Sequence, residues 1–196
     1  LYEALYSKGQ LRIEYESTIT RDAAETFAAR SGNCLSLVVM TAALARELGL
    51  NVRYQRVFSD DIWSRSGDLY VSSGHVNLTL GRKSGDPRVR FEEQKLLTID
   101  FYPLAPNQRH HAFEIREATV VAMFMNNRAA ENLAEGRLDD AYWWARESIR
   151  QDPTFLAAHN TLGVIYRHHG NLPEAERVLA HALRLEPANT RVLSNL

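Results

Sequence analysis

Residues 33–49 read Asn-Cys-Leu-Ser-Leu-Val-Val-Met-Thr-Ala-Ala-Leu-Ala-Arg-Glu-Leu-Gly, a long and largely apolar stretch. Asn33 can cap the start of a helix with its side chain, and Gly49 favours the end of one. Between them, apolar residues occupy nearly every side of the helix, a pattern typical of a buried central element. We therefore expect a core helix over residues 34–48, with Cys34 in its first turn.

Cys34 is the only cysteine of the sequence, which excludes an internal disulfide and a cysteine-rich metal site. The N-terminus of a helix offers partial positive charge and free amide groups. These favour a thiolate and can hold the oxygen of a tetrahedral intermediate, with the Cys34 amide as one donor. A lone cysteine on an apolar helix is, however, more often a buried structural residue. The residues that the fold brings beside Cys34 decide between these roles.

His75 and Asp100 are the candidate partners of Cys34. His75 opens one predicted strand, and Asp100 lies near the end of another. A cysteine nucleophile needs an imidazole as its base, and a carboxylate on the other ring nitrogen orients that imidazole. Asp60 and Asp61 are alternative carboxylates, but their position in a polar loop favours Asp100. Neighbouring strands would bring all three groups together.

The rest of residues 1–117 is typical of mixed α and β structure. A helical pattern covers residues 21–30, and the polar segment 64–73 is expected to be a surface loop. Short runs of β-branched or alternating residues predict strands over 52–58, 75–80, 89–93 and 96–101. Strands so close in sequence favour an antiparallel sheet.

The last third of the chain contains an internal repeat with an interval of 34 residues. The repeated pairs are Gly136 and Gly170, Leu138 and Leu172, Ala141 and Ala175, and Pro153 and Pro187. Each unit reads as two amphipathic helices. The predicted helices cover residues 122–135, 138–151, 156–169 and 172–185, and a third copy begins near Thr190.

This pattern resembles the tetratricopeptide repeat. The second copy carries the residues of that family at Leu162, Gly163, Tyr166, Ala175, Leu179, Ala182 and Pro187, whereas the first copy is degenerate. The resemblance implies all-α helical hairpins over residues 118–196 that bind a protein or peptide. Asn126 and Asn160 match a first-helix position on the concave face, where amides can bind a peptide backbone, although simple solvent exposure would also explain them.

Residues 17–103 resemble the transglutaminase-like cysteine fold. The likeness lies in residues 30–36, Arg-Ser-Gly-Asn-Cys-Leu-Ser, in residues 43–50, Ala-Leu-Ala-Arg-Glu-Leu-Gly-Leu, and in His75 and Asp100. It implies an α+β domain over residues 1–117, with a central cysteine-bearing helix against an antiparallel sheet. It further implies that Cys34 is the nucleophile, His75 the general base and acid, and Asp100 the orienting carboxylate.

The function implied is acyl transfer from an amide, with hydrolysis of amide or peptide bonds slightly favoured over crosslinking. The alternative is a non-catalytic scaffold for protein interactions with a degenerate transglutaminase-like domain. Trp63 and Asn33 could line a substrate groove over Cys34. The resemblance also suggests a bacterial protein of the periplasm or cell envelope.

Charge and composition limit the other classes of partner. Lys and Arg number 23 against 24 for Asp and Glu, so a net charge of −1 gives no electrostatic attraction to nucleic acid. No apolar run reaches the roughly 18–20 residues that span a bilayer. His110 and His111 have no obvious third metal ligand nearby and are expected in a loop. We expect no nucleic-acid partner, no membrane span, no metal and no cofactor.

Overall fold

The computed structural model describes residues 12–58, 64–66, 69–71, 75–81, 96–101 and 111–196. Contacts divide the chain into two compact units, Leu1–Ile115 and Arg116–Leu196. The predicted strand over 89–93 lies outside the described residues, as do Asp60, Asp61, Trp63 and His110.

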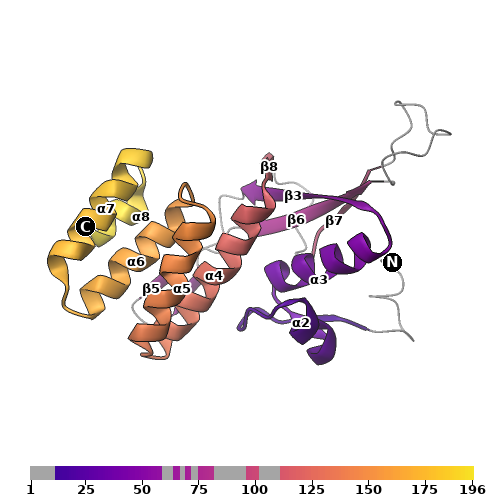
Figure 1. Ribbon diagram of the computed structural model, residues 1–196, viewed down its shortest axis with the longest axis horizontal. Helices are drawn as coiled ribbons and strands as arrows, with labels where there is room; N and C mark the ends of the chain where they lie inside the picture. The colour runs from indigo at the N-terminus through magenta and orange to yellow at the C-terminus, as the bar shows by residue number, and fades with distance from the viewer. Residues whose placement is uncertain (1–11, 59–63, 67–68, 72–74, 82–95, 102–110) are drawn as a thin grey trace. The chain divides into compact units, whose positions relative to one another are not determined.

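The main sheet of the first unit has four antiparallel strands in the order β7-β6-β3-β8 (Figure 1). They are β3 (Asn51–Phe58), β6 (His75–Gly81), β7 (Leu97–Ile99) and β8 (His111–Ile115). The antiparallel sheet is confirmed. The prediction that His111 lies in a loop is wrong: β8 pairs with β3 through its backbone, and four of its five residues are exposed, so no apolar pattern marks it.

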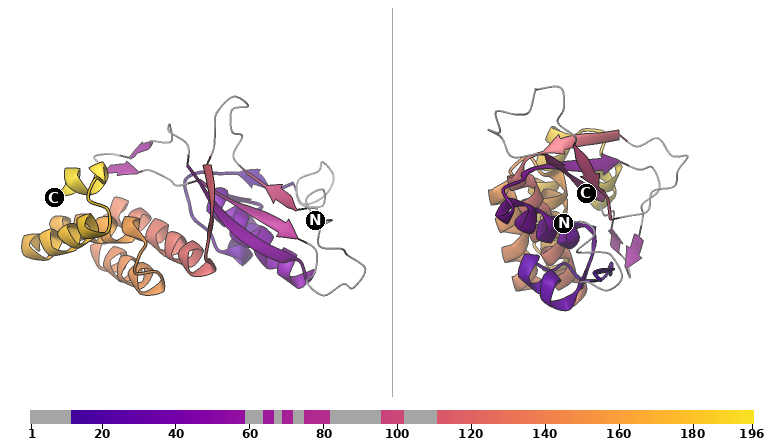
Figure 2. Two further views of the ribbon diagram at one scale, coloured as in Figure 1. Left: turned by 90° about the horizontal axis from the view of Figure 1, so that it is seen from above. Right: turned by 90° about the vertical axis from the view of Figure 1, so that its right-hand side faces the viewer.

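Helix α3 (Cys34–Glu47) packs against β6 and β3, as Figures 1 and 2 show. Its buried residues lie on most sides of the helix: Leu35, Ser36, Leu37, Val38, Met40, Thr41, Ala42 and Ala45. Each large apolar side chain buried in this way contributes about 1.5–3 kcal/mol. Asn33 caps the helix, and Gly49 follows it with a φ of 70°, which favours glycine. The predicted central helix is therefore confirmed.

Smaller elements complete the first unit. Helix α2 (Ala23–Ala29) begins two residues later than predicted because Asp22 and Glu25 form a capping box. The short strands β1 (Glu14–Tyr15) and β2 (Ser31–Gly32) pair in parallel. The segment predicted as a loop contains a hairpin of β4 (Ser64–Ser66) and β5 (Leu69–Val71), whose three-residue strands are too short to show alternation.

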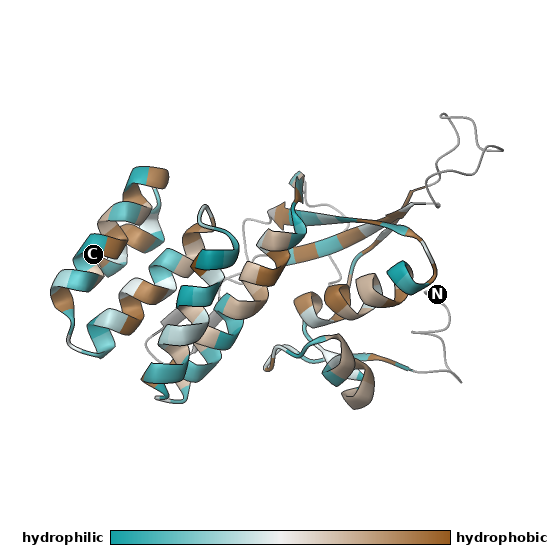
Figure 3. Ribbon diagram, viewed as in Figure 1, coloured by the Kyte–Doolittle hydropathy of each residue, from teal (hydrophilic) through white to brown (hydrophobic). Residues whose placement is uncertain are grey.

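The second unit is helical. Its elements are α4 (Glu117–Ala134), α5 (Leu138–Gln151), α6 (Leu156–His168), α7 (Leu172–Leu185) and α8 (Thr190–Asn195). Each helix contacts the next along the chain, and polar and apolar segments alternate on α5 to α7 (Figure 3). Helix α4 begins five residues earlier than predicted. No helix among the described residues combines the length and apolarity required to cross a bilayer.

Candidate functional site

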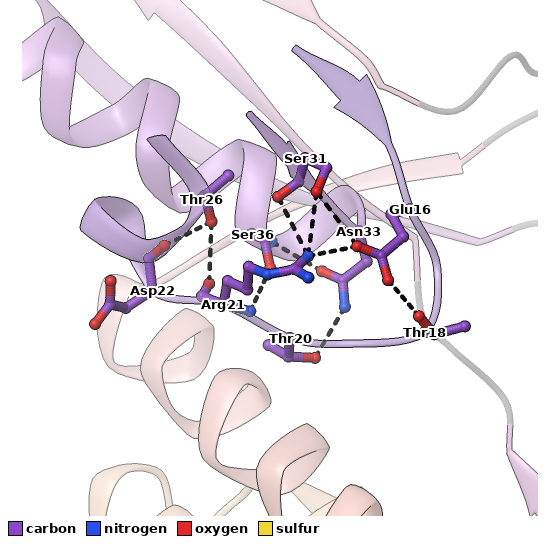
Figure 4. Close-up of polar contacts among 9 residues, drawn as sticks. All are labelled: Glu16, Thr18, Thr20, Arg21, Asp22, Thr26, Ser31, Asn33 and Ser36. Carbon is purple, nitrogen blue, oxygen red and sulfur yellow. Dashed lines mark hydrogen bonds and ion pairs between the residues drawn. The ribbon is translucent and has the colours of Figure 1, made fainter. Parts of the chain in front are cut away.

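Asn33 fixes the start of α3 and therefore the position of Cys34 (Figure 4). Its Oδ1 accepts a hydrogen bond from the backbone N–H of Ser36 at 2.9 Å. Its Nδ2 donates to Thr20 Oγ1 at 2.8 Å. The side chain is buried, and both of its ends are bonded within the protein. The structure thus places Asn33 beneath the helix start, where it acts as a cap and a tether.

A second set of contacts holds the residues just before Cys34 (Figure 4). The backbone N–H of Arg21 donates to Ser36 Oγ at 2.8 Å, and the Arg21 guanidinium lies 2.6 Å from Glu16 Oε2. At Gly32, an added Cβ would lie 2.7 Å from the Ser36 Cβ, so a larger residue would displace the first turn of α3. Backbone and side chains together make this segment a rigid support for the thiol.

The sheet register brings Asp100 to β6. Residues Leu78 and Ile99 are partners in the antiparallel pair of β6 and β7. Continuing that register places Asp100 opposite Asn77, with His75 two residues further along the same face of β6. His75 Nε2 donates to Asp100 Oδ1 at 2.6 Å, and Asn77 Nδ2 donates to Asp100 Oδ2 at 3.0 Å.

The imidazole of His75 lies between Asp100 and Cys34. Burial, which leaves the residue only 3 % exposed, would by itself lower the pKa of His75. Hydrogen bonds to Asp100 and to the Cys34 thiol, together with the charges of both groups, outweigh burial and raise this pKa to about 9. The ring is therefore mostly protonated at neutral pH. Because Nε2 bonds Asp100, Nδ1 is the ring nitrogen that remains for a hydrogen bond with the thiol.

Cys34 itself is neither fully buried nor fully exposed. The structure therefore brings together the three side chains that the sequence singled out, Cys34 from α3, His75 from β6 and Asp100 from the end of β7. Such a group can supply a nucleophile, a proton donor and an orienting carboxylate. Sequence reasoning did not single out Asn77, because its role depends on a register that the sequence alone does not reveal.

The other predicted site residues lie elsewhere. Of the two predicted groove residues, Trp63 lies outside the described residues, and Asn33 is buried with both ends of its amide bonded within the protein. Asn160 Oδ1 accepts a hydrogen bond from Asn195 Nδ2 of α8 at 3.0 Å, so this amide is engaged within the second unit. The Oδ1 of Asn126 is buried and has no hydrogen-bond partner among the described residues. In the part of the chain that the structure describes, no group of three or more His, Cys, Asp or Glu side chains has an arrangement that could hold a metal ion.

Comparison with known proteins bears on the second unit. Residues 156–189 match the family model of the tetratricopeptide repeat. The matched segment begins with α6 and includes the whole of α7. No curated protein matches the chain. The match supports a protein-interaction module in the second unit.

Proposed function

We propose that the first unit is a transglutaminase-like cysteine enzyme that transfers acyl groups from amide bonds of proteins or peptides. Hydrolysis is slightly favoured over crosslinking. The observation that carries this proposal is the placement of His75, which is hydrogen-bonded both to Asp100 and to the Cys34 thiol. Three groups of these types in this order form the minimal apparatus of a cysteine nucleophile.

The chemistry begins at Cys34. An imidazolium beside a thiol favours the thiolate, which attacks the carbonyl carbon of the scissile amide and forms the carbon–sulfur bond. The carbonyl oxygen becomes an oxyanion, for which the backbone N–H of Cys34 at the helix start is one donor. Cys34 is only partly buried, which agrees with a residue that meets a substrate.

His75 then acts as the acid and afterwards as the base. The imidazolium gives its Nδ1 proton to the nitrogen of the tetrahedral intermediate, and the carbon–nitrogen bond breaks to release the amine. The neutral ring next takes a proton from water, whose oxygen attacks the thioester carbonyl carbon. The carbon–sulfur bond then breaks, the carboxylic acid product leaves, and Cys34 returns as a thiolate beside the imidazolium. Asp100 stabilises the imidazolium throughout and holds the ring in one orientation.

The second unit contributes recognition. Its tetratricopeptide repeat provides helical hairpins whose surfaces bind protein partners, so we assign it the capture of a protein substrate or an adaptor. The alternative function is a scaffold without catalysis, formed by both units together, and it would leave the Cys34 group without a chemical role.

Trapping of the acyl-enzyme tests the proposal. The chain is incubated with a library of amidated and glutamine-containing peptides, quenched in acid and weighed intact by mass spectrometry. We expect a thioester adduct on the only cysteine, loss of the adduct in Cys34→Ala, and at least about a hundredfold slower formation in His75→Gln. If the second unit binds peptides but no peptide in the library forms a thioester on Cys34, the result would favour the non-catalytic scaffold.

A further inference from the structure

We propose that Asn77 is a positioning residue of the site, which holds one oxygen of Asp100 so that the other stays directed at His75. The inference rests on the proposed function, because it assigns a role within the same group of residues. The amide of Asn77 donates to Asp100, so Asn77 acts on the imidazole through that carboxylate.

The geometry of the carboxylate carries this inference. Asp100 presents Oδ1 to His75 Nε2 at 2.6 Å and Oδ2 to Asn77 Nδ2 at 3.0 Å. Hydrogen bonds on both of its oxygens restrain the turning of the carboxylate about its Cβ–Cγ bond. This restraint matters here because 24 % of the Asp100 side chain is exposed, so water competes for its oxygens.

The second observation is an amide oxygen with no donor. Asn77 is 5 % exposed, and its Oδ1 is buried without a hydrogen-bond partner among the described residues. Leaving a buried acceptor unpaired costs free energy that an apolar side chain of similar size would not. For stability alone, therefore, Asn is an unfavourable choice at this place in β6. The hydrogen bond from its Nδ2 to Asp100 explains why asparagine is present at this position.

The neighbouring polar pair shows the contrast. Thr79 lies on the same face of β6, two residues beyond Asn77, and its hydroxyl bonds that of Thr98 at 3.2 Å. Both strands thus carry polar groups on this face. The two threonine hydroxyls, however, bond each other and not Asp100. Thr79→Val is therefore a matched control, a buried polar residue made apolar on the same strand and face.

The experiment reads the protonation of His75 by NMR in the full chain with labelled histidine. In Asn77→Leu we expect the pKa of His75 to fall by at least about half a unit, a threefold loss of proton affinity. We expect the melting temperature of this variant to equal or exceed that of the parent. Thr79→Val should leave the His75 titration unchanged. Asn77→Val, smaller and β-branched, is measured alongside in case leucine does not fit.

A double variant shows whether Asn77 acts through Asp100. In an Asp100→Asn background, adding Asn77→Leu should move the His75 titration no further, because the two changes break one chain of contacts. An unchanged or raised His75 pKa in both single Asn77 variants overturns the positioning role. Equal shifts in Asn77→Leu and Thr79→Val would overturn it too. A different result would contradict the proposed function: the pKa of His75 in the parent chain is that of an ordinary histidine and is the same in Asp100→Asn.

Discussion

Replacing Asp100 with Asn should change the proton affinity of His75 more than any other substitution outside the ring itself. The pKa of His75 is raised from 6.5 to about 9, which is roughly a 300-fold gain in proton affinity. Burial opposes this rise, and of the two partners Asp100 makes the stronger hydrogen bond and exerts the stronger charge effect. Asp100 is therefore a principal cause of the raised pKa of His75. We expect the His75 pKa to fall by at least about one unit in Asp100→Asn.

The same shift predicts a pH dependence of stability. The folded-state pKa lies above the unfolded value, so the stabilisation is complete below pH 6.5 and is lost as pH rises through 9. A difference of this size corresponds to about 3 kcal/mol at most, and exposure of part of the Asp100 side chain reduces it to about 2 kcal/mol. In Asp100→Asn the loss of stability over this interval should be smaller by about half.

Two assays measure this prediction. NMR titration gives the pKa of His75 directly, and urea unfolding at several pH values between 6 and 9.5 gives the free energy of unfolding. Asp22→Asn is the control, because Asp22 is an N-cap and asparagine caps a helix nearly as well as aspartate. If His75 of the parent chain titrates at or below 6.5, or if parent and Asp100→Asn lose stability in parallel, the reasoning is refuted.

Three further predictions concern packing, capping and titration. Gly163→Ala would set a Cβ 2.6 Å from two carbons of Leu179. Overpacking costs about 1–3 kcal/mol, and the better helix propensity of alanine returns about 1 kcal/mol. Urea unfolding should therefore show a net decrease in the free energy of unfolding. Thr20→Val leaves the buried amide of Asn33 without its acceptor and should lower the free energy of unfolding by about 1–3 kcal/mol, whereas Thr20→Ser should restore most of it. Burial lowers the pKa of His159, so its contribution to stability is present above pH 6.5 and is lost as pH falls; melting temperatures at pH 7.5 and 5 should differ less in His159→Gln than in the parent. Opposite ordering of the variants in any of these measurements would contradict the corresponding prediction.

Caps, glycines and the spacing of apolar residues correctly predicted the helices in which they occur. The bounds of α3 follow from the Asn33 cap, the apolar residues after it and Gly49, all of which act within a few residues. The spacing of small and apolar residues likewise predicted the helices of the second unit. Strand β8 was missed because it pairs through its backbone while its side chains stay exposed. A pattern of burial cannot reveal a strand that buries little.

The candidate site was accessible to sequence reasoning only in part. The types and order of Cys34, His75 and Asp100 suggested a group, since cysteine chemistry needs those functions together. The second hydrogen bond of Asp100 depends on the pairing of β6 with β7, which places Asn77 opposite it. Register of this kind is set by long-range packing, so the contribution of Asn77 could be found only in the structure.

The rate of alkylation of Cys34 by iodoacetamide, measured from pH 6 to 9, tests the central claim most directly. Because the chain has one cysteine, every label reports on this thiol. The account predicts faster alkylation of the parent chain than of His75→Gln at pH 6 and 7, because an imidazolium beside the thiol favours the reactive thiolate. Identical pH profiles for the parent chain and His75→Gln would contradict the claim that these two side chains act as a pair.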